Sequence, residues 1–412
     1  MLDNAGTRQL AYVAKVTNIA PMNAERLECV YINGWTCVCG KGDFHIGDVG
    51  VFFEPDSQLP EVFPFTEIGF LASKHYKIKP QKIRGVISQG LFLPLSAFVA
   101  SDGSSPSWLA ATSLAVAQGC EETIFLTNEL GVTYAVSEDN HRKAPSVDKY
   151  KRMAQRHPTA AKSRLWRWLW HYKWGKKLLF FFFGKKRDKK NAWPVGRFPG
   201  VNKTDQERVE NMTWILQDKT PFIRTQKCDG SSGTYILERK GWHKYEFYVC
   251  SRNVRMMNED QECFYGSHNY YWEVADKYHI YDKMKEYLDL NREISFVCWQ
   301  GEICAPDIQG NPHNLTETHF YCFHCTDSKN GRWNILDAQE MWKAYNMEVV
   351  PIDCVDYIMP DDFEEFKKSA DGKYDSSVCE GNANCDREGY VYYKTDDPTF
   401  SFKNVSREYL VK

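Results

Sequence analysis

The sequence of 412 residues lacks the long apolar runs of membrane proteins. The run from Leu178 to Phe183 has only six residues, whereas a membrane-spanning helix needs about 20. No secretory signal opens the chain, and its 14 cysteines follow no regular framework. These features predict a cytoplasmic, reducing location with no transmembrane segment, and they argue against a small secreted scaffold held by disulfides.

The chain also lacks a large net charge, which is only -2. That value conceals a strongly basic segment, because residues 142–190 contain 17 Lys and Arg against 2 Asp, a local charge of +15. The rest of the chain has 35 Lys and Arg against 52 Asp and Glu, a charge of -17. Such an asymmetry indicates a polyanionic partner or an anionic surface.

The amino-terminal region is rich in short β-type runs. They span 10–16, 27–32, 35–39 and 49–53, and glycine-containing turns separate them. This spacing predicts a small barrel of the OB type, a fold often used to bind nucleic acids. We also expect a short helix from Leu109 to Ala117. Lys79, Lys82 and Arg84 follow the barrel strands and are candidates for contacts with nucleic acid phosphates, although a solvated rim fits their spacing equally well.

Tryptophans are interspersed in the basic segment. Three interpretations remain open: stacking and charge contacts with a nucleic acid backbone, binding to an anionic membrane surface, or an inserted linker that docks on a neighbouring domain. We therefore expect an OB-like nucleic-acid-binding domain at 1–142, a basic aromatic linker at 143–194 and a further domain at 195–412. In that last domain, residues 203–211 carry helix-start signals, with Thr204 or Asp205 as the cap.

The most distinctive short motif is Lys227-Cys228-Asp229-Gly230. Alternating apolar and polar residues run into and away from it, and turn residues follow it. This pattern is typical of a strand that turns back on itself, so an exposed hairpin turn is the simplest interpretation of the motif alone. The functional alternative is a nucleophilic lysine with a carboxylate two residues further on.

Further strands in the second half place polar residues where they can share one site. Arg252 and Glu302 each lie near the end of a strand, and Glu388 lies at the start of one. The run 320–325 is almost wholly aromatic or apolar, so that one of its rings can cover a base. Lys403 lies inside an apolar strand, where an unpaired ammonium is costly and an anion is expected nearby.

Lysines, an arginine, carboxylates and an aromatic surface are the groups that nucleotidyl transfer requires. Lys227 must attack an α-phosphorus as a free amine, although the ordinary pKa of lysine is about 10.4. We expect a neighbouring cation, Mg²⁺ or Lys403, to favour the neutral amine. Asp229, Glu302 and Glu388 are the expected Mg²⁺ set, acting through water ligands because Mg²⁺ dehydrates reluctantly.

The order of these motifs resembles that of the covalent nucleotidyltransferases, the superfamily of ATP-dependent ligases and mRNA capping enzymes. The details are most similar to ATP-dependent RNA ligases of the branch with an amino-terminal OB domain, the template-directed nick ligase type. The similar stretches are Lys227-x-Asp229-Gly230, 251–253, 301–303, 320–325, 388–391 and 401–403, together with 305–311, 203–208 and the OB-region stretches 34–35, 47–48, 56–60 and 84–90.

This resemblance implies an α+β protein in which an OB-type barrel precedes a nucleotidyltransferase domain of antiparallel sheets with flanking helices. Lys227 would take AMP from ATP, pass it to an RNA 5′-phosphate, and the RNA 3′-hydroxyl would then displace AMP. The implied catalytic residues are Lys227, Asp229, Glu302 and Lys403. The implied nucleotide-binding residues are Arg208, Gln226, Gly230, Arg252, Phe323 and Glu388. The implied cofactors are ATP and Mg²⁺ or Mn²⁺, and the partner is RNA, bound by a monomer that repairs nicks.

Two departures from the family pattern stand out. Val405 occupies the place of a second motif V lysine, and residues 143–192 match nothing in the family. Only seven residues follow Val405, which disfavours capping enzymes and most DNA ligases. These remain the enzymatic alternatives, and a catalytically inactive nucleic-acid-binding protein is the non-enzymatic one. The spacing of Cys322 and Cys325 is partly zinc-like, but we expect buried thiols there.

Overall fold

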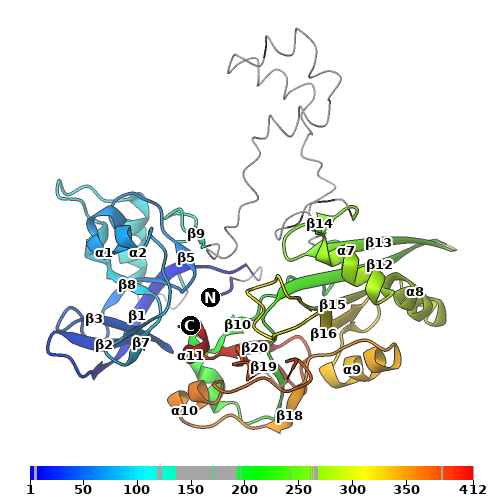
Figure 1. Cartoon of the computed structure of the whole chain (residues 1–412). Coiled ribbons are helices and arrows are strands. Elements are labelled where there is room, and N and C mark those ends of the chain that lie inside the picture. Colours follow the sequence, from blue (N-terminus) through cyan, green and yellow to red (C-terminus); the bar gives the residue numbers. More distant parts are fainter. Residues whose placement is uncertain are drawn as a thin grey trace.

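The computed structural model describes the chain as two domains (Figure 1). The described residues are 1–3, 7–117, 123–135, 169, 193–194, 196–241, 243–259, 261, 263, 268–381 and 384–411. The expected linker at 143–194 lies almost wholly outside them, and so do its tryptophans at 166, 168, 170 and 174. Strands dominate both domains and helices flank them, which confirms the predicted α+β class. None of the helices in the described ranges is long and apolar enough to cross a membrane.

The amino-terminal OB domain is built on a five-stranded antiparallel sheet in the order β3-β2-β1-β4-β8. Its strands are β1 (Ala11–Pro21), β2 (Leu27–Ile32), β3 (Trp35–Gly40), β4 (Val49–Phe53) and β8 (Leu91–Pro94). The first four confirm the runs expected from the sequence. The register of β1 against β2 shifts between Val16 and Asn18, and the first half of β1 pairs with β4. Such a bulge lets one strand turn a corner in a small barrel.

Each face of this sheet has its own aromatic core. Phe52 packs with Tyr12 and Trp35 on one face. Phe53 packs with Phe65 on the other face, as expected because successive strand residues point in opposite directions. The remaining elements are β5 (Ser57–Gln58), η1 (Phe65–Glu67), α1 (Gly69–Ser73), β6 (Gln81–Ile83), β7 (Val86–Ser88), η2 (Leu95–Phe98), α2 (Ser107–Ala117) and β9 (Thr133–Tyr134). Helix α2 confirms the predicted helix.

The carboxy-terminal domain contains two sheets. One has five strands in the order β10-β20-β19-β11-β18, and the other has six in the order β14-β13-β12-β15-β16-β17. The first comprises β10 (Glu207–Arg208), β11 (Phe222–Gln226), β18 (Ile352–Tyr357), β19 (Gly389–Lys394) and β20 (Ser401–Val405). The second comprises β12 (Ser231–Gly241), β13 (Lys244–Ser251), β14 (Arg255–Met256), β15 (Phe296–Cys304), β16 (His319–Asp327) and β17 (Gly331–Arg332). The pairings are antiparallel except that of β10 with β20.

Helices cover the outer side of the six-stranded sheet (Figure 1). These helices are α7 (Tyr270–Lys277), α8 (Ile280–Leu290) and α9 (Ile335–Ala344). The second domain also contains four shorter helical elements: η5 (Val209–Asn211), η6 (Thr213–Gln217), α10 (Phe363–Lys368) and α11 (Arg407–Leu410). Trp299, Trp342 and Met284 lie in the core between sheet and helices and are fully buried. Cys322 and Cys325 are buried in the same core, and burial raises the pKa of both thiols. This confirms the expected buried thiols.

The hairpin interpretation of the Lys227 motif is wrong. The strand before it, β11, pairs with β18 and β19, whereas the strand after it, β12, pairs with β13 and β15. Residues 227–230 are therefore the connection between two sheets and not a turn within one. A Cβ atom on Gly230 would lie 2.3 Å from the carbonyl oxygen of Ile303, so only glycine permits the connection to pass this close to β15.

The helix expected near 203–211 is also replaced by other structure. Residues 207–208 form β10, which pairs in parallel with β20, and only the 3₁₀ turn η5 follows. The side chains of the expected caps are bound elsewhere: Thr204 Oγ1 lies 2.6 Å from Ser232 Oγ, and Asp205 contacts Arg252. Tertiary partners thus use the polar side chains that would otherwise cap a helix.

Asn211 connects the two domains. Its side-chain oxygen accepts hydrogen bonds from Tyr12 Oη, at 2.9 Å, and Trp35 Nε1, at 2.6 Å. Its side-chain nitrogen donates to Glu54 Oε1, at 2.9 Å, and to Glu207 Oε1, at 2.8 Å. All of the polar capacity of this amide is therefore satisfied at the interface, which fixes how the OB domain sits on the second domain.

Candidate active site

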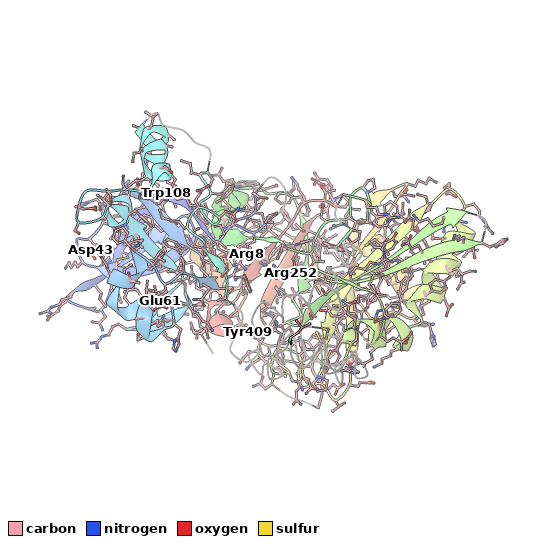
Figure 2. The ribbon with its side chains drawn as sticks, turned by 90° about the horizontal axis from the view of Figure 1, so that it is seen from above. Arg8, Asp43, Glu61, Trp108, Arg252 and Tyr409 are labelled. Carbon is pink, nitrogen blue, oxygen red and sulfur yellow. The ribbon has the colours of Figure 1, made fainter. Side chains whose placement is uncertain are left out.

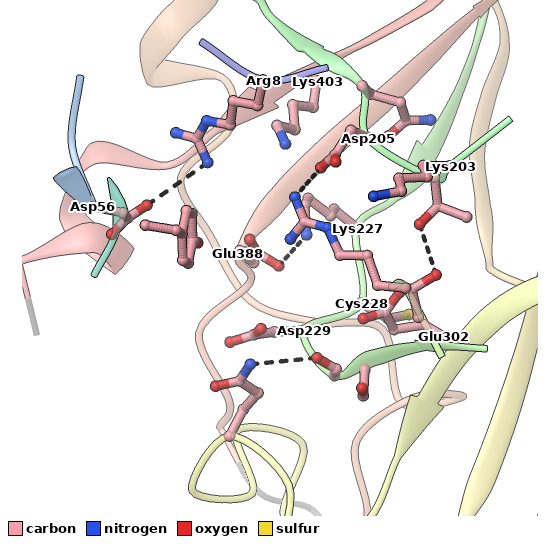
Figure 3. A pocket seen from close by; sticks show the side chains of 18 of the residues that line it. Arg8, Asp56, Lys203, Asp205, Lys227, Cys228, Asp229, Glu302, Glu388 and Lys403 are labelled. Atoms are coloured by element: carbon pink, nitrogen blue, oxygen red, sulfur yellow. Dashed lines mark hydrogen bonds and ion pairs between the residues drawn. The ribbon is translucent and has the colours of Figure 1, made fainter. Parts of the chain in front are cut away.

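A cavity of about 1000 Å³ lies where the OB domain meets the two sheets of the second domain (Figure 3). Every residue that the sequence placed in the catalytic, nucleotide-binding or metal set lines this cavity: Lys227, Asp229, Glu302, Lys403, Arg208, Gln226, Gly230, Arg252, Phe323 and Glu388. They come from strands of both sheets and from the segments that adjoin those strands. The fold therefore brings together residues that are up to 195 positions apart in the sequence, as for Arg208 and Lys403.

Lys227 lies at the exit of β11 and points into the cavity. Its backbone is held at both ends, since its N–H donates to the carbonyl of Gly389 at 3.0 Å and its carbonyl accepts from Tyr374 Oη at 2.8 Å. Its Nζ lies 2.6 Å from Glu388 Oε2 (Figure 3). Burial disfavours the ammonium form, but Glu388, Glu302 and Asp229 outweigh burial and raise the pKa of Lys227.

This result corrects one expectation. The pKa of Lys227 is raised and not lowered, because the three carboxylates outweigh both burial and any repulsion by Lys403. It is Lys403 whose pKa is lowered, to about 7, by burial and by the positive charges of Arg208, Arg8 and Lys227. The anion expected near Lys403 is only partly supplied, by the opposing charge of Asp205.

The carboxylates around Lys227 repel one another. Burial and the charges of Glu388 and Asp229 raise the pKa of Glu302 to about 8, although Lys227 opposes this. Burial and Glu388 raise the pKa of Asp229 to about 7. Three carboxyl groups thus face a single ammonium group in a buried space, an imbalance that a divalent cation would relieve.

The donor set suits Mg²⁺ or Mn²⁺, because Asp229, Glu302 and Glu388 present only hard oxygen ligands. Within the described ranges, however, no three His, Cys, Asp or Glu side chains are close enough together to hold a metal ion directly. The three carboxylates therefore fit a cation that keeps part of its water shell, as the sequence analysis expected. These residues would hold it by accepting hydrogen bonds from its waters.

Cationic side chains gather on the opposite side of the cavity. Arg208 is 6% exposed, and one of its terminal nitrogens lies 3.6 Å from Asp56 Oδ2. In the described part of the chain, its Nε and Nη1 have no hydrogen-bond partner. Buried guanidinium nitrogens are rarely left without acceptors, so we expect an anion to bind near Arg208.

Arg8, from the OB domain, extends this basic surface. Its Nη2 lies 3.2 Å from Glu54 Oε2, and its Nη1 lies 3.9 Å from Asp56 Oδ2. Figure 3 shows Arg8 beside Lys403. No sequence signal assigned Arg8, Asp56 or Tyr134 to this cavity, because they belong to the other domain and only docking brings them there.

The stretch Lys203-Thr204-Asp205 lines the cavity as well. Asp205 contacts Arg252, and Lys203 Nζ donates to Asn253 Oδ1 at 2.9 Å. The sequence marked this stretch as similar to a family motif but assigned it no role. Its side chains orient Arg252 and its neighbour in the cavity.

The remaining predicted residues shape the cavity wall. Phe323 is half-buried on β16 and faces the cavity. The side-chain carbonyl of Gln226 accepts the backbone N–H of Asp375 at 2.9 Å, so Gln226 holds a neighbouring loop as well as lining the cavity. Gly230 lets the chain approach β15 as described above.

The three basic residues of the OB domain lie outside this cavity. Lys79, Lys82 and Arg84 are exposed on and beside the β6–β7 hairpin, and none of them lines the cavity. Lys82 Nζ lies 3.5 Å from Glu408 Oε1 on α11. They form a separate basic rim on the OB domain, and Lys82 reaches the second domain.

Two residues that no motif indicated hold Asp229: Tyr409, which lines the cavity, and His313, which lies behind its wall. Tyr409 Oη donates to Asp229 Oδ2 at 2.6 Å. The backbone N–H of Asp229 donates to His313 Nε2 at 3.1 Å, and the other ring nitrogen of His313 lies 2.9 Å from the carbonyl oxygen of Val378. Both residues are remote in sequence from Asp229, and pattern analysis of a single chain has no signal for such contacts.

The fold and the cavity together define a nucleotidyltransferase domain with an OB-fold domain in front of it. Residues 10–95 match a family model described as an OB-fold domain, and residues 220–406 match the RNA ligase family model. The chain thus carries an OB-fold domain followed by a domain of the RNA ligase family. A search of curated protein sequences found no match.

Solved structures of the Naegleria gruberi RNA ligase are similar over nearly the whole length. The structure with PPi has a TM-score of 0.68 at 26% identity, covering 98% of each chain. A variant with ATP and Mn has a TM-score of 0.68 at 25% identity, and a variant with AMP and Mn has 0.67 at 26%. Both cover 98% of this chain and 98% of the other.

Proposed function

We propose that this protein is an ATP-dependent RNA ligase that joins RNA 3′-hydroxyl and 5′-phosphate ends. The observation that carries the proposal is the convergence of all ten predicted site residues on one cavity, with the Lys227 amine at its centre. The similar Naegleria gruberi ligase structures with ATP, AMP and Mn support ATP and a divalent cation as the cofactors here. Free cysteines throughout the described chain fit a reducing, cytoplasmic location.

In the first step, the Lys227 Nζ lone pair forms a bond to the α-phosphorus of ATP, and the bond to pyrophosphate breaks. The ammonium must first lose a proton, and the carboxylates around it oppose this loss. Glu388 Oε2, 2.6 Å away, is the acceptor in place for that proton. A bound Mg²⁺ would neutralise charge on the carboxylates and on the phosphate oxygens.

The basic side of the cavity would bind the phosphates. Lys403 has a pKa of about 7 without an anion, and an adjacent phosphate would favour its charged form. Charged Lys403 would then stabilise the negative oxygens of the transition state. Arg208 offers two donors without partners in the described structure, and Arg252 would contact ribose or phosphate. Phe323 would stack on adenine.

In the second step, a 5′-phosphate oxygen of RNA would attack the phosphorus of the Lys227 adduct, and the lysine amine would leave. The RNA 3′-hydroxyl oxygen would then attack the 5′-phosphorus and expel AMP. The exposed rim of Lys79, Lys82 and Arg84 would bind the RNA backbone next to the cavity. Repair of nicks by a monomer is the use that we propose.

A labelling experiment tests this proposal. Protein incubated with ATP labelled at the α-phosphate and Mg²⁺ should acquire the label covalently, and Lys227→Ala should not. Lys219→Ala is the matched control, because Lys219 pairs with Asp361 at the surface and lies outside the cavity. GTP in place of ATP, and DNA in place of RNA 3′-ends, separate an RNA ligase from capping and DNA-joining enzymes. Absence of any wild-type adduct with Mg²⁺ and Mn²⁺ would refute the proposal.

A further inference from the structure

Tyr409 on α11 lines the cavity and has no role in the proposed reaction as described so far. Its hydroxyl donates a hydrogen bond of 2.6 Å to Asp229 Oδ2, and its side chain lines the cavity. Figure 2 shows Tyr409 in the middle of the molecule, near Arg8 and Arg252. No motif of the sequence includes it.

Helix α11 is held in place from several directions. The Ser406 side chain caps it by accepting the backbone N–H of Tyr409 at 3.1 Å. Arg407 pairs with Glu364 of α10 and donates from Nε to Gln89 Oε1 of the OB domain at 3.2 Å. Tyr409 therefore occupies a position that both domains determine, which is more rigid than a chain terminus usually is.

Asp229 needs such a partner. Its backbone is fixed by His313, but its carboxylate stands in a buried site with Glu388 and Lys227 nearby. The hydrogen bond from Tyr409 Oη holds Oδ2 of this carboxylate in one orientation.

We propose that Tyr409 is a positioning residue for adenylylation: its hydroxyl holds the Asp229 carboxylate in the orientation that the cation and Lys227 require. The inference rests on the proposed function and deepens it. Without the hydroxyl, the carboxylate is free to rotate towards the Lys227 ammonium. That rotation removes a hard, charged oxygen from the cation site.

The test is Tyr409→Phe, which keeps the ring and removes only the hydroxyl. We expect single-turnover formation of the Lys227 adduct to slow about 10- to 100-fold, the usual value of a hydrogen bond to a charged group. The Mg²⁺ concentration for half-maximal rate should rise. Tyr281→Phe is the matched control, because Tyr281 is exposed on α8 and lies outside the cavity; its rate should equal that of wild type.

Two further measurements separate positioning from a structural role. The affinity for Mn²⁺ with a non-hydrolysable ATP analogue, measured from the EPR signal of the free ion, should weaken about fivefold to tenfold in Tyr409→Phe. In an Asp229→Asn background, Tyr409→Phe should change the adduct rate less than about twofold, because a residue that acts through Asp229 has nothing left to position. Thermal unfolding of each variant verifies that it is folded.

The outcomes distinguish this inference from the proposed function. Suppose that wild type forms the adduct and that Tyr409→Phe changes neither the rate of adduct formation nor the Mn²⁺ affinity. This result overturns the inference and leaves the ligase proposal standing. If Tyr409→Phe slows adduct formation by the same factor in the Asp229→Asn background as in wild type, the inference is overturned as well, because the hydroxyl then does not act through Asp229. If wild type forms no adduct, the ligase proposal fails and this inference fails with it.

Discussion

The two sides of the cavity shift the pKa of a lysine in opposite directions. On the acidic side, carboxylates from the ligase-family domain raise the pKa of Lys227. On the basic side, burial and arginines from both domains lower the pKa of Lys403 to about 7. Each lysine is thus in the wrong protonation state for the proposed chemistry while the cavity holds only protein. We therefore expect ATP and a cation to complete the site electrostatically, each correcting the charge of one side.

Loss of the lysine on the basic side should have the largest effect. Lys403→Met removes the cation proposed to face the α-phosphate, and we expect adduct formation to slow about 1000-fold, as for other donors to a developing negative charge. Label transfer in single turnover measures it. Lys403→Arg is the informative companion, since arginine keeps its charge at every working pH.

An arginine variant as slow as the methionine one would show that charge at residue 403 is insufficient. An unaltered rate in Lys403→Met would contradict the proposed role of the basic side altogether.

On the acidic side, Glu302→Gln should slow adduct formation about 100-fold and raise the Mg²⁺ requirement, because one of three carboxylates around the cation is lost. The kinetic measurement is a Mg²⁺ titration of the single-turnover rate. Glu317→Gln serves as the control, because Glu317 is exposed and lies outside the cavity. A lower rate with an unchanged Mg²⁺ dependence would separate Glu302 from the cation.

The basic rim outside the cavity should behave differently from both sides. We expect Ala substitution of Lys79, Lys82 and Arg84 together to leave the adduct rate within about twofold and to weaken RNA sealing about tenfold, since only phosphate contacts are lost. Sealing measured over a salt series should also show a shallower dependence on salt in the triple variant. An equal loss in both assays would place these residues in the adenylylation step.

The smallest expected effect is the exchange of protons when ATP or the cation binds. This exchange tests the contrast between the two sides of the cavity most directly. At pH 8, Lys403 with a pKa of about 7 is mostly neutral, so a phosphate that restores its charge draws in at most about 0.9 proton. A cation acts in the reverse direction, because it lowers the raised pKa values of Asp229 and Glu302 and releases protons.

Calorimetry in buffers of different ionisation enthalpy should therefore show proton uptake with metal-free ATP at pH 8 and less uptake, or release, when Mg²⁺ is present. Lys403→Met should abolish the uptake. Binding heats that do not depend on the buffer would show that the two sides do not exchange protons with ligands.

Much of the fold was accessible from the sequence because strand patterns are local. The runs that became β1 to β4 and α2 alternate or cluster in ways that short stretches reveal. The connectivity at Lys227 was not accessible, because hydrogen bonds to β19 and β15, far along the chain, decide which sheet each flanking strand joins. The prediction of a helix near 203–211 was wrong for the same reason, since part of that segment pairs with β20 as strand β10.

The site shows a similar division. Lys227, Glu302 and Lys403 were identified because their motifs occur in a fixed order along the chain. Arg8 and Tyr409 were not, because domain docking and α11 bring them to the cavity from opposite ends of the sequence. The direction of the pKa shift of Lys227 could not be predicted from the sequence either, since it depends on how closely three carboxylates approach one amine.

The connection at residues 227–230 has a mechanical consequence. Glu388 precedes β19, in the same sheet as β11, whereas Glu302 belongs to β15, in the same sheet as β12. Lys227 therefore lies at the junction of the two sheets, and each sheet carries one of its carboxylates. A rotation of one sheet against the other would change the distance from Glu302 to Lys227 and leave the contact with Glu388 intact. We therefore expect core substitutions behind either sheet to change the spacing of the two acids without contacting ATP or RNA.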